Sequence, residues 1–397
     1  MVSALVMVLI ALALAYLLSE FFRWFGMPRV VGQICAGLFL GFGTLRLILF
    51  HDENLKVLHF LSNLGIILLF YYIGLEMNVK SISKYAKKTL VISLFKALFP
   101  FLLGYLIMRY AFNFSNLASI IIGVSLSAGA QSVTIDLLDE LKMLKSRIGS
   151  MIISIGVITD IIELLIVGVL LAMFEAATNK LAFPKFLLFI AVFFFFIIAA
   201  RIWFIPYTLR LFDREKSSTS RFMGAMIIVL LVVALSEFLG IGALVGALVA
   251  GIIIRQTIFK EVSIPDWEEH DIARSIHIIA FGFLIPLFFV WIGLNTDLSL
   301  IISNYIYTIL FIAIAIIGVI GGTWIAVLLS KGTSKEGVIL GWGLSPKGDI
   351  GFVVGALALE ANLINPQIFS SLIIMAMIIT IVSPIVFKKL MINSRKH

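Results

Sequence analysis

The sequence has 397 residues, of which 61% are hydrophobic and 13% are charged, and its mean hydropathy is +1.15. A soluble domain carries about 25% charged residues, so this composition excludes a soluble domain with one anchor and predicts an all-α polytopic membrane protein. The net charge of +8 does not indicate nucleic-acid binding, because the basic residues lie in short loops between apolar segments. The single cysteine, Cys35, excludes a disulfide framework within the chain and a cysteine zinc site.

In chain order we predict about 13 transmembrane segments, with boundaries near 2–22, 28–48, 57–77, 89–110, 116–138, 148–175, 182–200, 222–239, 241–258, 275–295, 299–329, 337–360 and 366–387. Of the 30 lysines and arginines, 23 lie in one set of alternate loops and five in the other. This bias predicts a multi-pass protein with its N-terminus outside and its C-terminus in the cytoplasm. The first segment has no basic residues before it, so we expect a retained helix and not a cleaved signal peptide.

An internal repeat relates the two halves of the chain. Residues 66–78 match residues 285–297 at an offset of 219, residues 126–128 match 344–346 at 218, and residues 36–37 match 250–251 at 214. The matched segments run in opposite directions, which is the inverted-repeat architecture of alternating-access transporters. We therefore expect one transmembrane domain over 1–397, with a first repeat at about 2–175, a linker helix at about 182–213 and a second repeat at about 222–390. No soluble C-terminal nucleotide-binding domain is expected.

Two of the predicted segments are interrupted at corresponding positions. The segment 116–138 contains Ser-Leu-Ser-Ala-Gly-Ala-Gln-Ser at 125–132, and the segment 337–360 contains Gly-Trp-Gly-Leu-Ser-Pro-Lys-Gly-Asp-Ile-Gly at 341–351. Paired interruptions of this kind indicate the binding site of a transporter, built from two discontinuous helices. Lys347 and Asp349 are expected to neutralise the carbonyl and amide ends of the half-helices.

Asp160 is the candidate ion-binding residue. It lies in the middle of the apolar segment 148–175, in which the other charged residue near it is Glu163. A carboxyl group at membrane depth is costly, so its presence predicts a functional role. A carboxylate beside exposed carbonyls suits Na⁺, and the same group can bind a proton, so the two ions compete for one site. Glu163 lies one turn later, either as a second titrating group or, as we favour, paired with a buried cation such as Lys96.

The motifs together resemble the monovalent cation:proton antiporter superfamily in its second branch. The resemblance rests on residues 28–38, on Gly74-Leu75-Glu76, on residues 286–289 and 292–294, and on Ser345-Pro346-Lys347-Gly348-Asp349-Ile350-Gly351. It covers nearly the whole chain and implies the antiporter fold with two crossing discontinuous helices, a dimerisation part and a core that moves like an elevator. It also implies a homodimer in the cell membrane, no cofactor and no enzymatic activity.

The same resemblance implies that Asp160 carries Na⁺ and the proton. Electrogenic members have two adjacent aspartates, whereas this chain has Thr159 at the first position, which resembles members that exchange one cation for one proton. In the first interrupted segment the family often has Thr-Ser where Gly129-Ala130 stand, so backbone carbonyls or the side chains of Ser127, Gln131 and Ser132 would complete the site.

We therefore predict exchange of Na⁺, or Li⁺, for H⁺ by alternating access, with 1:1 stoichiometry. One alternative is a K⁺/H⁺ antiporter or a potassium-efflux transporter. A remote alternative is an intramembrane aspartyl protease that would use Asp160 and Asp349, but Pro346-Lys347-Gly348-Asp349 is not the Gly-x-Gly-Asp of such enzymes.

Overall fold

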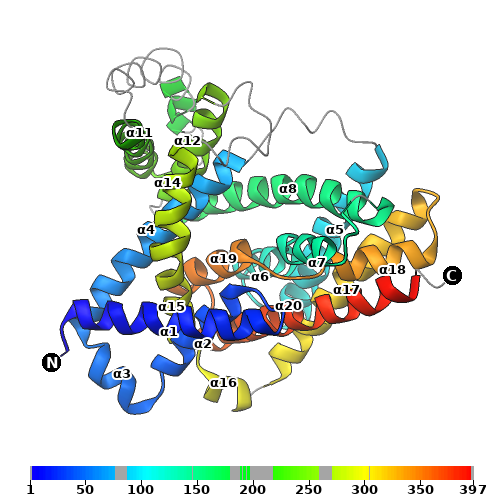
Figure 1. The fold of residues 1–397 in the computed structure, drawn as a ribbon, viewed down its shortest axis with the longest axis horizontal. Coiled ribbons are helices and arrows are strands. Elements are labelled where there is room, and N and C mark those ends of the chain that lie inside the picture. Colours follow the sequence, from blue (N-terminus) through cyan, green and yellow to red (C-terminus); the bar gives the residue numbers. More distant parts are fainter. Residues whose placement is uncertain are drawn as a thin grey trace. The chain divides into compact units, whose positions relative to one another are not determined.

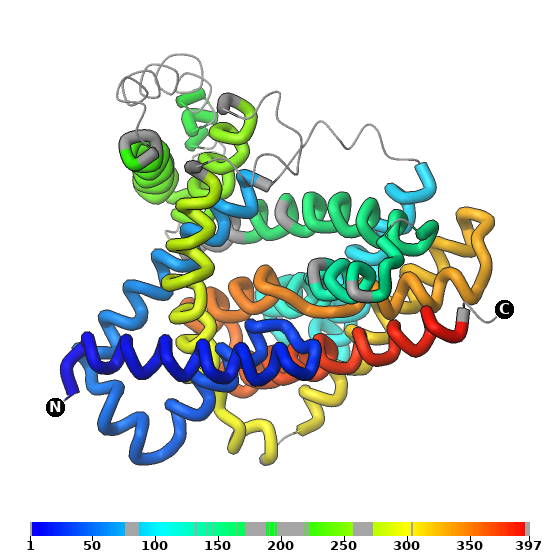
Figure 2. The backbone as a smooth tube through the Cα atoms, in the orientation of Figure 1, coloured from blue at the N-terminus to red at the C-terminus, as the bar shows by residue number. Residues whose placement is uncertain are grey.

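The computed structural model describes residues 2–76, 87–144, 146–178, 218–258, 271–303 and 305–394, with short pieces between 188 and 196. Within these stretches the chain is helical and contains no strand, as the composition predicts. Figures 1 and 2 follow the helices along the chain. The chain forms two compact units: unit 1 draws on Met1–Leu12, Leu47–Lys80 and Gly168–Trp291, and unit 2 on Ala13–Arg46, Ser81–Val167 and Ile292–His397.

Unit 1 is built around one long helix, α4 (Asp52–Glu76). This helix packs along α12 (Ala243–Ile258), which in turn packs against α11 (Ser218–Phe238). The chain continues through α14 (Asp271–Ile279), a π-helical turn at Ala280–Leu284 and α15 (Ile285–Leu294), whose last residues belong to unit 2. Ser62 of α4 donates a hydrogen bond of 3.3 Å to the carbonyl of Leu287, so a polar contact ties α4 to α15 inside the apolar packing.

Unit 2 is a helical bundle that holds most of the motifs described in the sequence analysis. Its helices include α1 (Ala4–Trp24, from Ala13), α2 (Arg29–Leu40), α5 (Lys87–Leu106) with a π-helical turn at Ile107–Ala111, α6 (Asn116–Ser127), α7 (Ser132–Glu140), α8 (Arg147–Thr178, up to Val167), α16 (Leu298–Ser303), α17 (Ile306–Leu329), α18 (Ser334–Gly343), α19 (Asp349–Glu360) and α20 (Pro366–Ser394). Two long helices at equivalent positions of the two repeats, α5 and α17, pack along each other. Gly318 faces Pro100 and Gly322 faces Phe99, and these small residues allow the close approach.

A reciprocal pair of glycine contacts reflects the sequence repeat. In unit 1 a Cβ on Gly74 would overlap the carbonyl oxygen of Leu248 and lie 3.0 Å from the Cα of Gly251. In unit 2 a Cβ on Gly293 would overlap the carbonyl oxygen of Ile34 and lie 2.8 Å from the Cα of Gly37. Gly74 corresponds to Gly293, and Gly37 to Gly251, at the offsets of the repeat. Each half therefore packs its glycine helix on the equivalent helix of the other half, as expected of two copies related by a two-fold axis.

Seven helices in the described part of the chain are long and apolar enough to cross a membrane, or eight if the bent pair α2 and α3 (Gly43–Leu49) counts as one span. The predicted count of 13 spans is not confirmed, because several of the predicted segments are bent or divided into shorter helices. The segment 28–48 bends by 89° between α2 and α3, and the segments 116–138 and 337–360 each divide into two short helices. The segment 299–329 is α16 followed by α17, and most of the expected linker helix lies outside the described residues.

Candidate ion-translocation site

Both predicted helix interruptions are present, and the two broken segments meet. Residues 128–131 separate α6 from α7, and residues 344–348 separate α18 from α19. The backbone N–H of Ala130 donates a hydrogen bond of 2.8 Å to the carbonyl of Pro346, so the two breaks are directly joined. Thr134 Oγ1 donates to the carbonyl of Gly343 at 2.6 Å, which satisfies a carbonyl at the end of α18.

Close backbone approach explains the small residues at the crossing. A Cβ on Gly348 would lie only 2.5 Å from the Cβ of Ala130 and 3.1 Å from the carbonyl oxygen of Gly129. The second break is also anchored from α20, because the N–H of Lys347 donates to Thr380 Oγ1 at 3.0 Å and this hydroxyl donates to the carbonyl of Lys347 at 2.9 Å. The crossing is therefore fixed by hydrogen bonds on both sides of the second break.

The side chain of Lys347 is buried and reaches across to the first broken segment. Its Nζ donates a hydrogen bond of 2.5 Å to the carbonyl of Leu126, in the last turn of α6. Asp349 is the first residue of α19, next to its partly positive N-terminus. These positions are those that the compensation of helix dipoles requires. The role itself remains our proposal, and it leads to a test.

We expect Lys347→Met to lower the free energy of unfolding by about 1.5–3 kcal/mol, the usual contribution of a hydrogen bond to a charged group. The reason is that the Leu126 carbonyl would lose its ammonium donor in a place from which water is excluded. Thermal unfolding of the detergent-solubilised protein measures the change. Lys335→Met, at an exposed position of α18, is the matched control, and an equal loss of stability in the two variants would contradict the assignment.

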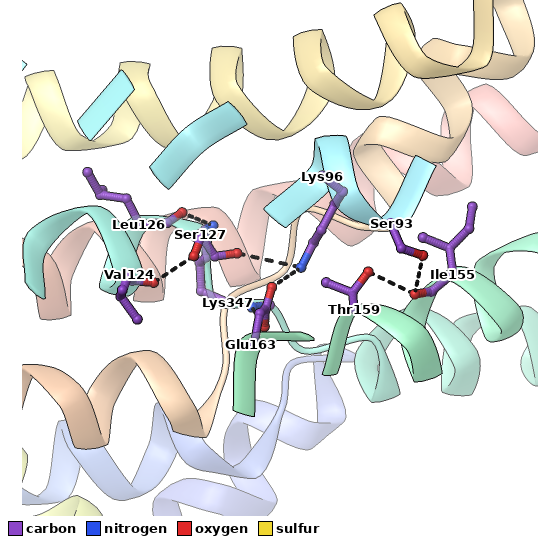
Figure 3. Close-up of polar contacts among 10 residues, drawn as sticks. Ser93, Lys96, Val124, Leu126, Ser127, Ile155, Thr159, Glu163 and Lys347 are labelled. Carbon is purple, nitrogen blue, oxygen red and sulfur yellow. Dashed lines mark hydrogen bonds and ion pairs between the residues drawn. The ribbon is translucent and has the colours of Figure 1, made fainter. Parts of the chain in front are cut away.

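A buried ion pair lies beside the first break. Lys96 of α5 and Glu163 of α8 are 0% and 1% exposed, and Lys96 Nζ lies 2.6 Å from Glu163 Oε1. The same ammonium group is 3.5 Å from the carbonyl oxygen of Ser127, and Glu163 Oε2 accepts a hydrogen bond of 3.1 Å from the N–H of Gly129. Figure 3 shows Lys96 reaching toward both Ser127 and Glu163. The pairing of Glu163 with Lys96 favoured from the sequence is thus confirmed.

The helical register of α8 places Asp160 on the face that meets the first break. Glu163 contacts Gly129, and a Cβ on Gly156 would lie 2.8 Å from the Gln131 side chain, so positions 156 and 163 both face residues 129–131. Asp160 falls between them, at the helical spacing i, i+4, i+7 that lies along one face. Its side chain is partly exposed, whereas Glu163 is buried. Asp160 therefore sits beside the helix crossing and remains accessible.

The other residues predicted for the site lie around the same break. Thr159 is buried, and its Oγ1 donates to the carbonyl of Ile155 at 2.8 Å, while Ser127 Oγ donates to the carbonyl of Val124 at 2.9 Å. Each hydroxyl group thus donates its proton to a carbonyl of its own helix, and its oxygen keeps lone pairs that can bind a cation. Gln131 is buried at the start of α7, and the side chain of Ser132 lies outside what the structure describes.

Two polar residues of the crossing were not predicted. Thr134 and Thr380 satisfy backbone groups at the ends of the broken helices. A single threonine in an apolar segment also bonds to its own helix in many proteins, so only their position opposite a break distinguishes them. The sequence alone does not show which threonine lies opposite a break.

Known proteins have similar sequences and a similar fold. Residues 8–392 match the family described as sodium/hydrogen exchanger, transmembrane. The chain is 28% identical over 371 residues to a Na⁺/H⁺ antiporter of Enterococcus hirae, with 93% of each chain covered. It is 26% identical to the Na⁺/H⁺-K⁺ antiporter GerN of Bacillus cereus, covering 91% of this chain and 90% of that relative. The solved structure of the sodium proton antiporter MjNhaP1 of Methanocaldococcus jannaschii superposes with a TM-score of 0.62 at 16% identity, covering 96% of this chain and 95% of that one.

Proposed function

This chain belongs to the transmembrane sodium/hydrogen exchanger family, and from that membership we propose that it exchanges Na⁺ for H⁺ by passing one site, centred on Asp160, between the two sides of the membrane. The protein is a multi-pass membrane cation/proton antiporter and not an enzyme. The observation that supports Asp160 as the carrier is its place on the face of α8 that meets the helix crossing.

The division of labour between the two carboxylates of α8 follows from their burial. Glu163 is committed to Lys96 and to the N–H of Gly129. Asp160 is partly exposed one turn earlier and can be reached by ions. A carboxylate that is beside backbone carbonyls at membrane depth binds either a small cation or a proton, since leaving the charge uncompensated there is costly. Competition of the two ions for Asp160 is enough to couple their opposite movements.

We propose a stoichiometry of one cation for one proton. The position before Asp160 holds Thr159, whose hydroxyl donates to Ile155 and which carries no charge. One carboxylate then alternates between a neutral protonated form and a neutral Na⁺-bound form. Both forms cross the membrane without moving net charge.

The arrangement in the cell follows from the loops and the family. We propose that the N-terminus is outside, the C-terminus is in the cytoplasm and the protein works as a homodimer in the plasma membrane. The loop bias of lysine and arginine supports the orientation. Relatives described as Na⁺/H⁺-K⁺ and K⁺/H⁺ antiporters make K⁺ the second candidate cation for the same site.

Proton flux in proteoliposomes tests the function, the cation and the stoichiometry together. We expect a Na⁺ gradient, and to a lesser extent a Li⁺ gradient, to drive H⁺ movement at a rate that stays the same when the membrane potential is clamped at zero or at either polarity. A pH-sensitive dye inside the vesicles reports the flux. A clear acceleration or slowing by the potential would contradict 1:1 exchange, and flux driven only by K⁺ would favour the second candidate.

A further inference from the structure

We propose that the chain contains a second monovalent-cation site, formed by Glu163 and the Ser127 carbonyl, and that the ammonium group of Lys96 permanently fills it. The proposal rests on the proposed function, in which Asp160 is the carboxylate that exchanges ions. It explains why the Glu163 site does not exchange them as well. The lysine acts as a tethered cation that is not transported.

The ligands around the Lys96 ammonium are those that a small hard cation would use. Its Nζ lies 2.6 Å from a carboxylate oxygen of Glu163 and 3.5 Å from the carbonyl oxygen of Ser127. Ser127 is the last residue of α6, where carbonyl groups lack helical partners and carry partial negative charge. A carboxylate and a carbonyl at the end of a broken helix form an oxygen ligand set. The ammonium group thus stands where a free ion would bind.

The local backbone is shaped to accept the ammonium. A Cβ on Gly129 would lie 2.5 Å from Lys96 Nζ, so any other residue at 129 would displace it. Glu163 is held from its other oxygen by the Gly129 N–H at 3.1 Å, which fixes the carboxylate toward Lys96. Lys96 and Glu163 are almost completely buried. In a pair so enclosed each charge compensates the other, and an unpaired buried charge is strongly unfavourable.

This arrangement separates the site from the exchange cycle. A free ion bound at Glu163 would be released whenever the site opens, but the lysine cannot leave because its backbone belongs to α5. The carbonyl of Leu126, the residue before Ser127, accepts a hydrogen bond from Lys347 Nζ. Asp160, one turn before Glu163, then remains the carboxylate that gains and loses an ion.

The test counts Na⁺ bound to purified protein kept in Na⁺ throughout, using radioactive sodium. We expect one Na⁺ per wild-type chain and two per Lys96→Ala chain, because alanine removes the tethered charge and leaves room for an ion beside Glu163. Lys96→Met is the matched control: it removes the same charge but fills the room with an uncharged side chain of similar length, so it should bind one. The double variant Lys96→Ala with Glu163→Gln should also bind one.

The location of the added ion is tested with Asp160. Lys96→Ala combined with Asp160→Asn should keep one bound Na⁺, whereas Asp160→Asn alone should bind none. If the proposed function is wrong, the Na⁺ counts of the wild type and of Asp160→Asn will differ from those expected. The comparison of Lys96→Ala with Lys96→Met would still test the second site.

Three outcomes would overturn the proposal. The first is two Na⁺ bound to the wild-type chain, since the lysine would then exclude nothing. The second is a folded Lys96→Ala chain that binds no more Na⁺ than Lys96→Met. The third is a Lys96→Ala chain that fails to fold in Na⁺ or is less stable there than Lys96→Met, because a free ion would then be unable to replace the ammonium group.

Discussion

Asp160→Asn is expected to reduce Na⁺-driven proton flux in proteoliposomes by about 100-fold, because an amide neither takes up a proton nor compensates a cation. The loss of a charge-assisted contact amounts to about 3 kcal/mol, and each 1.4 kcal/mol is a factor of ten. The fold should persist, since Asp160 is partly exposed and asparagine has nearly the same shape. The dye assay measures flux, and gel filtration in detergent confirms that the variant is intact.

Asp139→Asn is the matched control for this substitution. Asp139 is an exposed carboxylate near the end of α7, and the site that we propose does not include it. We expect its flux to stay within a factor of two of the wild type. Flux through Asp160→Asn close to the wild-type rate would remove Asp160 from the mechanism and direct attention to Glu163.

Gly293→Ala is expected to cause a large loss of stability although it lies outside the ion site. Its new methyl group would overlap the carbonyl oxygen of Ile34, a backbone atom that cannot move independently of α2. Overpacking of this kind costs about 1–3 kcal/mol, or more where backbone must shift. Gly74→Ala should behave in the same way against Leu248. Thermal unfolding in detergent measures both.

Gly168→Ala provides the control for the glycine substitutions. Gly168 also lies within a helix, α8, but nothing stands within 4 Å of the place where its Cβ would be. The added methyl should leave stability unchanged or raise it by up to about 1 kcal/mol, because alanine favours the helix over glycine. If Gly293→Ala and Gly168→Ala gave equal melting temperatures, the tight crossing at Gly293 would be contradicted.

The sequence predicts the local structure well where a residue is out of place in its surroundings. Pro346 and the glycines beside it interrupt an apolar segment, and both predicted breaks are present. Glu163 and Lys96 are rare charges within apolar helices, so their pairing could be anticipated from the cost of leaving either alone. The repeat offsets likewise identify Gly74 and Gly293 as equivalent positions before their contacts are known.

Other features depend on three-dimensional distances that no periodicity encodes. The reach of Lys347 to Leu126 joins residues 221 positions apart, and the place of Thr380 beside the second break depends on how α20 crosses it. The bend of 89° between α2 and α3 lies at Gly41-Phe42-Gly43, and glycines in an apolar segment do not by themselves reveal a bend. The number of spans cannot be predicted for the same reason, since hydropathy does not distinguish one long helix from two short ones joined by a break.

The reciprocal glycine contacts have a consequence for how such a chain could have arisen. If the two halves were identical, the contact of Gly74 with Gly251 and that of Gly293 with Gly37 would be one contact occurring twice. An ancestral protein of half this length, inserted into the membrane in both orientations, could have assembled through that single interface as an antiparallel pair. Gene fusion would then have required no new packing, and it would have freed each copy to diverge, leaving a carboxylate at position 160 and an isoleucine at the matching position 378.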